Sequence, residues 1–171
     1  MAETEIIMGN VMDYLEWRGD LTFDQSPFND VDNVILSQLA YVNFRDVIPS
    51  VQMNKGITLK AAAQLFFDLH TEEELMQDKS FIKDAPKLLK KAAQTNRFRD
   101  VILSDYVDMV DETLEKQFGA FHIKLSPQCT YVAFRGTDDT LVGWKEDFNM
   151  SFISPVPSQE DAVKYLDDTC S

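Results

Sequence analysis

The sequence has few cysteines, and their number indicates the redox environment in which the protein works. Among 171 residues only Cys129 and Cys170 occur. One lies in a predicted strand and one near the end of the chain. Two such cysteines do not make the disulfide framework of a small secreted domain. They fit a reducing compartment, and the cytoplasm is the expected location.

Basic side chains and long apolar runs are also scarce. Lysine and arginine number 16 against 29 acidic residues, which gives a formal net charge of −13. This balance repels nucleic acid and anionic membrane surfaces, so neither is an expected partner. No apolar run approaches transmembrane length, and the N-terminus lacks the pattern of a secretory signal. The remaining composition, 44% hydrophobic and 26% charged, is typical of one soluble globular domain with a real core.

The N-terminal part, residues 1–97, is predicted to be a mainly helical layer. Capping residues precede short segments of helical spacing or composition at several places. The capping residues are Asn10, Asn29 or Asp30, Thr58, Thr71 with Glu74, and Asp84 before Pro86. An apolar stripe that must be buried runs along the second helix. Its members are Val31, Val34, Ile35, Leu39 and Val42. His70 falls at the end of the helix capped by Thr58, where the helix dipole favours an imidazole, and a structural role is expected.

Residues 98–171 change to an alternating pattern that predicts strands. Beyond Phe98, one side of an extended run carries Val101, Leu103, Asp105 and Val107. Phe121, Ile123 and Leu125 then form the apolar face of a half-buried strand, so His122 is expected on the surface. The turn at 126–128 predicts an antiparallel hairpin with the strand that ends at Arg135. A last helix is predicted over residues 159–166.

The stretch from Cys129 to Phe148 is the centre of the sequence pattern. A strand rich in β-branched and aromatic residues stops at Arg135 and is followed by Gly136, which permits a tight turn, and by Thr137, Asp138 and Asp139. Open α/β sheets build their sites where a buried strand ends in such a turn. The alternative is a solvated turn, which the spacing alone favours because one glycine turn is a weak signal.

Two long motifs in this chain resemble a known family. Residues 131–137 read Tyr-Val-Ala-Phe-Arg-Gly-Thr and are followed by Trp144 and Asp147, which is similar to the oxyanion-loop segment of class 3 lipases. The segment 134–148, together with Tyr-Leu-Glu-Trp-Arg-Gly-Asp at 14–20, resembles an uncharacterised bacterial family of lipase-like α/β-hydrolases. The resemblance runs over nearly the whole chain but covers only the first part of that family's domain.

The resemblance implies roles for four residues. Thr137 matches the residue whose backbone N–H, often with its hydroxyl, donates to the oxyanion in class 3 lipases. Asp138 and Trp144 match the lid region, where they would contact substrate. Asp147 matches an acidic position read as structural, capping a helix or pairing with Arg135. No cofactor or metal is implied. A metal site on Asp138, Asp139, Glu146 and Asp147 is a third alternative that acidic turns seldom support.

The chemistry that the resemblance implies is incomplete. None of the six glycines frames a serine, so the Gly-x-Ser-x-Gly elbow of α/β-hydrolases is absent, and His70 and His122 do not match the family's catalytic context. The sequence therefore leaves open whether the protein is an enzyme. One reading is the N-terminal fragment of a serine esterase that is inactive alone and acts on an acyl-ester or lipid-like substrate only when complete. The other is a non-catalytic binding or interaction protein on the same scaffold.

The fold expected from these observations is α/β. A helical layer over residues 1–97 is followed, over 98–171, by the first strands of an α/β-hydrolase-type sheet, the oxyanion-type loop and a crossover helix. The single domain, 1–171, is truncated before the nucleophile elbow. The strand at Thr130–Phe134 would then lack its neighbour, and an open apolar edge recruits another strand. The expected consequence is dimerisation through that edge, rearrangement of the last helix over it, or aggregation. The alternative is a monomer that its high negative charge keeps soluble.

Overall fold

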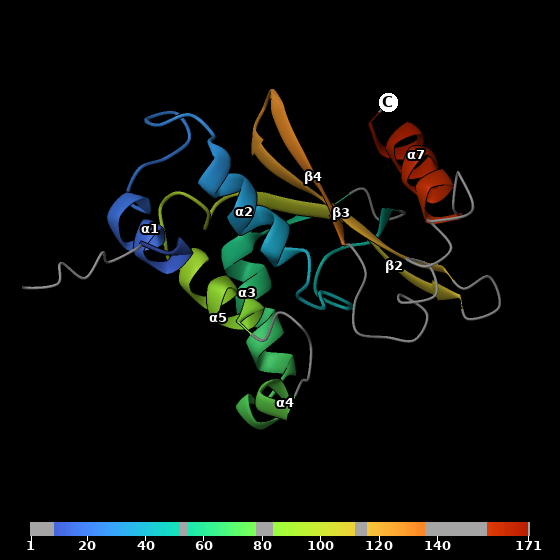
Figure 1. Cartoon of the computed structure of the whole chain (residues 1–171), viewed down its shortest axis with the longest axis horizontal. Helices are drawn as coiled ribbons and strands as arrows, with labels where there is room; N and C mark the ends of the chain where they lie inside the picture. Colours follow the sequence, from blue (N-terminus) through green and yellow to red (C-terminus); the bar gives the residue numbers. More distant parts are fainter. Residues whose placement is uncertain (1–8, 52–54, 78–83, 112–115, 136–156, 171) are drawn as a thin grey trace, which may run out of the picture.

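The computed structural model describes residues 9–51, 55–77, 84–111, 116–135 and 157–170. The helices that precede the long strands group on one side of the sheet, and a last helix lies apart from them (Figure 1). The bounds of the first group are α1 (Val11–Arg18), α2 (Asp30–Leu39), α3 (Leu59–Leu69), α4 (Glu72–Gln77) and α5 (Ala85–Ala92). The last helix is α7 (Pro157–Thr169). No helix in the described ranges is long and apolar enough to cross a membrane.

Local capping explains where the first helices begin. The Asn10 side chain accepts hydrogen bonds from the backbone N–H groups of Met12 and Asp13, and the Asp13 carboxylate accepts one from the Asn10 N–H. Asn29, rather than Asp30, caps α2 in the same reciprocal way. Thr58 caps α3, and Thr71 with Glu74 forms the capping box at the start of α4. These four helix starts, expected from the sequence, are confirmed because each depends on groups within one turn. Asp84 precedes α5 as expected, but its side chain makes no capping hydrogen bond and pairs with Lys87 instead.

The described strands form an antiparallel sheet in the order β1–β2–β3–β4. Their bounds are β1 (Gly56–Thr58), β2 (Ile102–Asp111), β3 (Lys116–Ser126) and β4 (Cys129–Arg135). Ser126 pairs with Cys129 across the turn, so the hairpin predicted from the sequence is confirmed. The larger arrangement, in which these strands open an α/β-hydrolase-type sheet, stays a prediction. Within the described residues β4 is an edge strand, and self-association through it also stays a prediction.

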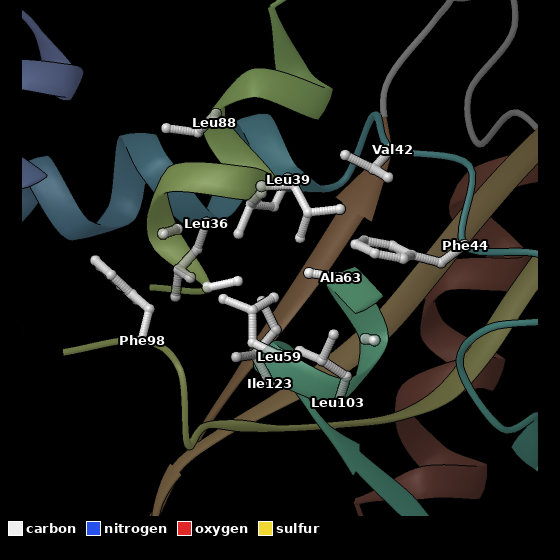
Figure 2. Packing of buried hydrophobic residues seen from close by; sticks show 14 of the residues in the cluster. Leu36, Leu39, Val42, Phe44, Leu59, Ala63, Leu88, Phe98, Leu103 and Ile123 are labelled. Carbon is white, nitrogen blue, oxygen red and sulfur yellow. The ribbon is translucent and has the colours of Figure 1, made fainter. Parts of the chain in front are cut away.

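The main core lies between the helical layer and one face of the sheet. Phe44, Ile35, Leu36, Leu89 and Ile123 are completely buried. Figure 2 shows the side chains that converge there, from α2, α3, α5, the connecting segments and the strands. Those labelled are Leu36, Leu39, Val42, Phe44, Leu59, Ala63, Leu88, Phe98, Leu103 and Ile123. Of the stripe predicted on the second helix, Ile35, Leu39 and Val42 are buried, whereas Val31 and Val34 are 37% and 42% exposed.

A β-bulge in β2 changes which residues face the core. The pairing of β2 with β3 shifts between Ser104 and Val107, and Asp105 has a φ of 57°. Leu103 packs in the main core, but after the bulge Tyr106 points to that side while Val107 packs on the opposite face. The predicted continuous face of Val101, Leu103, Asp105 and Val107 is therefore wrong, because one extra residue reverses the alternation.

Helix α7 covers the opposite face of the sheet. A second apolar cluster forms there from Phe118 and Ala120 on β3 and Tyr165 on α7. The Tyr165 hydroxyl donates to the carbonyl oxygen of Asp105 at 2.8 Å. His122, expected on the surface, is instead only 6% exposed. The expectation failed because it assumed that only one face of the strand would be buried.

The motif at residues 14–20 has a structural role in this fold. Gly19 packs so closely on Thr95 that a Cβ atom at this position would lie 2.6 Å from the Thr95 Cγ2. The carbonyl oxygen of Gly19 accepts a hydrogen bond from the Arg97 N–H at 3.0 Å. The Tyr14 hydroxyl donates to the buried carboxylate of Asp32 at 3.0 Å. The motif therefore fastens α1 to α2 and to the segment that follows α5.

Candidate functional site

The residues proposed as a site from the family resemblance are not among those the structure describes. Thr137, Asp138 and Trp144 all lie in the segment 136–156, outside the described residues. Asp147, expected to cap a helix or pair with Arg135, lies there too. The same holds for the whole acidic set weighed as a metal site. Their roles stay predictions.

The end of β4, which leads toward that segment, is held by a cluster of charges. Arg135 forms an ion pair with Asp108 on β2, and the second carboxylate oxygen of Asp108 lies 3.2 Å from the Arg45 guanidinium. The Asp108 side chain is 8% exposed, so two cations share a nearly buried anion. The described partner of Arg135 is therefore Asp108. This cluster holds two positive charges against one negative charge, and it anchors the strand end to β2.

A cleft between α3 and α5 is a candidate binding site in the described part of the chain. Its volume is about 540 Å³, which is in the usual range for small-molecule sites. One wall is a single face of α3, and the other comes from the end of α5 and the segment after it. The lining residues are Lys60, Ala63, Gln64, Phe67, His70, Lys90, Ala93, Gln94 and Arg99.

The cleft is basic in a chain that is strongly acidic. Lys60, Lys90 and Arg99 line it, whereas no aspartate or glutamate is among its described lining residues. The chain as a whole carries a net charge of −13. A concave surface with low-dielectric walls focuses the field of such charges and raises the local concentration of anions. The electrostatics of the cleft therefore favour a negatively charged ligand.

Two of the basic residues are backbone neighbours at one end of the cleft. The backbone N–H of Lys60 donates to the carbonyl oxygen of Arg99 at 3.0 Å, so these residues are direct neighbours. The Arg99 guanidinium has one exposed partner, Asp100 at 3.1 Å, and such surface pairs contribute little free energy. Within the described residues Lys60 has no carboxylate in salt-bridge range. Both cations are therefore available to a ligand.

The position of Lys60 departs from local helix preferences. Lys60 lies in the first turn of α3, which contains no acidic residue. The positive end of the helix dipole disfavours a cation there by a few tenths of a kcal/mol. Local rules are broken most often where a residue serves a site rather than the fold. The first backbone N–H groups of α3 already donate to Val101, Arg99 and Thr58, so the Lys60 ammonium is the group that an anion at this end would meet.

The middle and far end of the cleft have different chemistry. Ala63 and Ala93 are 5% and 6% exposed and form a small apolar floor. At the far end lie the partly exposed rings of Phe67 and His70, with the Lys90 ammonium 5.8 Å from the centre of the Phe67 ring. The cleft therefore combines a cationic end, an apolar floor and an aromatic end.

Sequence reasoning missed this cleft, although part of its signal was present. His70 was placed correctly at the end of α3, where its backbone N–H donates to Phe66, but only a structural role was expected. Lys60, Gln64 and Phe67 follow one another at helical spacing, which puts them on one face of α3. Only the packing of α5 against that face brings Lys90 and Arg99 to the same place.

A second group of polar residues joins α7 to the sheet. The His122 Nε2 lies 3.0 Å from the Thr169 hydroxyl, and its Nδ1 lies 3.8 Å from the carboxylate of Asp105. The Thr169 hydroxyl also donates to the carbonyl oxygen of Tyr165 at 2.6 Å, and the Tyr165 ring packs edge-on against the imidazole. Because the hydroxyl hydrogen is donated to Tyr165, the Thr169 oxygen accepts from the His122 Nε2–H, while the Asp105 carboxylate lies beyond hydrogen-bond distance of Nδ1. These contacts hold the C-terminal half of α7.

We expect this contact to weaken as the solution becomes acidic. Burial lowers the pKa of His122 below its usual 6.5, and the charge of Asp105 only partly opposes the shift. Because the unfolded chain binds the proton more tightly, the stabilisation is fully present above about pH 6.5 and is lost as pH falls toward the folded-state pKa. Urea unfolding from pH 7.5 to 5.5, followed by tyrosine fluorescence, measures this loss.

The matched variant for that measurement is His122→Gln, which keeps a polar side chain without the titration. Its stability should vary less with pH than that of the wild type over the same range. Parallel pH profiles for the two proteins would show that His122 does not contribute the expected dependence.

Comparison with known families gives one match. The model of a family described as Mbeg1-like matches residues 92–171, a little under half of the chain. The matched segment includes β2, β3, β4 and α7 and the second of the two sequence motifs, but not the first. Comparison with curated proteins and with solved structures gives no match.

These findings correct the family assignment drawn from the motifs. The matching family is Mbeg1-like, not a lipase or α/β-hydrolase family. The described sheet is antiparallel throughout, whereas an α/β-hydrolase sheet is largely parallel. The interpretation of the chain as a fragment of a lipase-like serine esterase is therefore wrong, as is the hydrolase description that went with it. The two motifs misled here because a strand followed by a glycine turn is compatible with many folds.

Proposed function

We propose that this protein binds a small anionic ligand in the cleft between α3 and α5. The single observation that carries the proposal is the gathering of Lys60, Lys90 and Arg99 around one cleft of about 540 Å³. They are three of only 16 basic residues in the chain. The proposed function is binding, not catalysis. It keeps the non-catalytic alternative that the sequence raised, but it drops the α/β-hydrolase scaffold that went with that alternative.

The charges of the cleft support a ligand with more than one negative charge. The Lys60 and Arg99 end offers an ammonium and a guanidinium, which are the groups that recognise phosphate and carboxylate oxygens. Lys90 supplies a third charge, and its contact with the partly exposed Phe67 ring is weak enough for an anion to replace it. Gln64 and Gln94 add amide groups along the walls.

The cytoplasm is the proposed location. Cys129 and Cys170 are both free and exposed. Exposed thiols persist where the environment is reducing, and small phosphorylated and carboxylated compounds of the kind proposed as ligands are abundant in the same compartment.

Inorganic pyrophosphate is the probe for the proposed site, because it is small and carries several charges. We expect calorimetry at low ionic strength to detect binding that weakens as salt is added. Lys60→Ala and Arg99→Ala should each weaken it roughly tenfold, since a hydrogen bond to a charged group contributes about 1.5–3 kcal/mol.

Lys87→Ala is the matched control. Lys87 is on α5 beside the cleft but outside its lining, and its side chain is 75% exposed and paired with Asp84. Its removal should leave the affinity for pyrophosphate unchanged. Absence of binding at millimolar pyrophosphate, or equal losses in the control and the cleft variants, would overturn the proposal.

A further inference from the structure

We infer that the ligand of the α3–α5 cleft is a phosphorylated compound with a planar ring, of the nucleoside monophosphate class. The inference rests on the proposed function and adds to it the second half of the ligand. It follows from the unequal ends of the cleft, one bearing Lys60 and Arg99 and the other Phe67 and His70. Lys90 lies over the Phe67 ring, and a ligand ring that stacks there takes its place.

The separation of the two ends supports this class of ligand. Lys60 and Phe67 are seven residues apart on the same helix, and a rise of ~1.5 Å per residue places them about 10 Å apart along its axis. A phosphate, a pentose and a base in line span a similar length. A simple inorganic anion would occupy the cationic end and leave the aromatic end unused.

At the aromatic end of the cleft, two partly exposed rings pack on a buried one. The Phe67 ring packs edge-on against Phe66 at 5.2 Å, and the His70 ring lies 4.6 Å from the same Phe66 ring. Phe66 is 2% exposed, so it supports the two rings from beneath, while both Phe67 and His70 remain partly exposed. A planar ligand ring can stack on this surface, which gains affinity with little dependence on the identity of the base.

The floor of the cleft is consistent with a sugar between the two ends. Ala63 and Ala93 have the smallest side chains that still make an apolar surface, and both are almost completely buried. Gln64 and Gln94 line the cleft beside them, where their amides can bond to hydroxyl groups. The Gln64 amide nitrogen already donates to Asp68 at 2.9 Å, which orients its side chain along the wall.

Three probes separate the contributions of ring and charge in the unmodified chain. They are adenosine monophosphate, ribose 5-phosphate and adenosine, and their affinities are measured by calorimetry. We expect the monophosphate to bind roughly tenfold more tightly than ribose 5-phosphate, because stacking of one base adds about that factor. Adenosine should bind more weakly than the monophosphate, because it lacks the charge.

Two variants assign the halves of the ligand to the ends of the cleft. Phe67→Leu keeps an apolar side chain but removes the ring, so the preference for the monophosphate over ribose 5-phosphate should fall toward one. Lys60→Ala should weaken both phosphates by the same factor and keep the preference. Circular dichroism checks that each variant is folded, and the wild-type comparison stands without either variant.

The outcomes separate this inference from the proposed function. Equal affinity for the monophosphate and ribose 5-phosphate in the wild type would overturn the ring inference while anion binding stands. Binding of adenosine as tight as that of the monophosphate would overturn the proposed anion site itself. If none of the three probes binds but pyrophosphate does, the ligand class is wrong; if pyrophosphate also fails, both proposals fall.

Discussion

Replacing Arg97 with methionine is expected to lower the free energy of unfolding by about 3–5 kcal/mol, because the carboxylate of Asp32 would lose its partner in the core. Both side chains are completely buried. The Arg97 Nε and one terminal nitrogen donate to the two Asp32 oxygens at 2.7 and 2.5 Å. A buried charge without its partner is among the few causes of such a large loss.

The expected loss is large because the guanidinium also secures a loop. Its terminal nitrogens donate to backbone carbonyls between residues 21 and 27, and its carbon lies 4.3 Å from the centre of the Phe23 ring. The hydrogen bond to Asp32 raises the pKa of Arg97 further, so the group stays charged at every pH of interest. Methionine fills the space but supplies none of these donors.

Urea unfolding followed by circular dichroism measures the change. Lys87→Met is the matched control, because its partner Asp84 and Lys87 itself are both highly exposed. Such surface pairs contribute about 0–1 kcal/mol. The accompanying double variant Arg97→Met with Asp32→Leu should recover part of the loss, since no unpaired charge remains. A loss for Arg97→Met no larger than for the control would show that the buried pair does not stabilise this fold.

Replacing Phe44 with alanine is expected to cost a similar amount, about 3–5 kcal/mol, for a different reason. Phe44 is completely buried and lies in the segment between α2 and β1. Its ring packs edge-on against Phe66 of α3 and against Phe121 of β3, with centroids 6.2 and 5.6 Å away. The side chain therefore joins the helical layer to the sheet, and its removal leaves a cavity between them.

Phe28→Ala is the comparison for this prediction. Phe28 also contacts two aromatic rings, Phe23 and Tyr131, but it is 40% exposed. Its loss should cost only about 1 kcal/mol, the usual contribution of an aromatic pair. Denaturant midpoints at unchanged slope give both values. Equal effects of the two substitutions would mean that the core around Phe44 relaxes and closes the cavity.

Features that depend on residues within one or two turns were predicted correctly from the sequence. The caps at Asn10, Asn29 and Thr58 place the helix starts, because each side chain bonds N–H groups two or three positions away. The hairpin between β3 and β4 follows from a short turn between two alternating runs. The net charge and the composition likewise follow from the sequence without any tertiary structure.

Features that depend on distant elements were missed or misread. His122 is buried by α7, and its partner on that helix, Thr169, lies 47 positions further along the chain. The alternation along β2 changes at Asp105, where a bulge with positive φ adds a residue that no periodicity shows. The family interpretation failed for a related reason, since it inferred a whole sheet from two sequence motifs.

By itself the sequence determined the starts of the helices, the β3–β4 hairpin and the strongly acidic character of the chain, because these depend on near neighbours or on composition alone. The tertiary structure decided which charges meet. Asp32 and Arg97 are 65 positions apart, and no local rule pairs them. Lys60 and Lys90 reach one cleft only because α3 and α5 pack with those faces together. Helix spacing specifies a face, whereas the partner of that face depends on how all the apolar surfaces are buried at once.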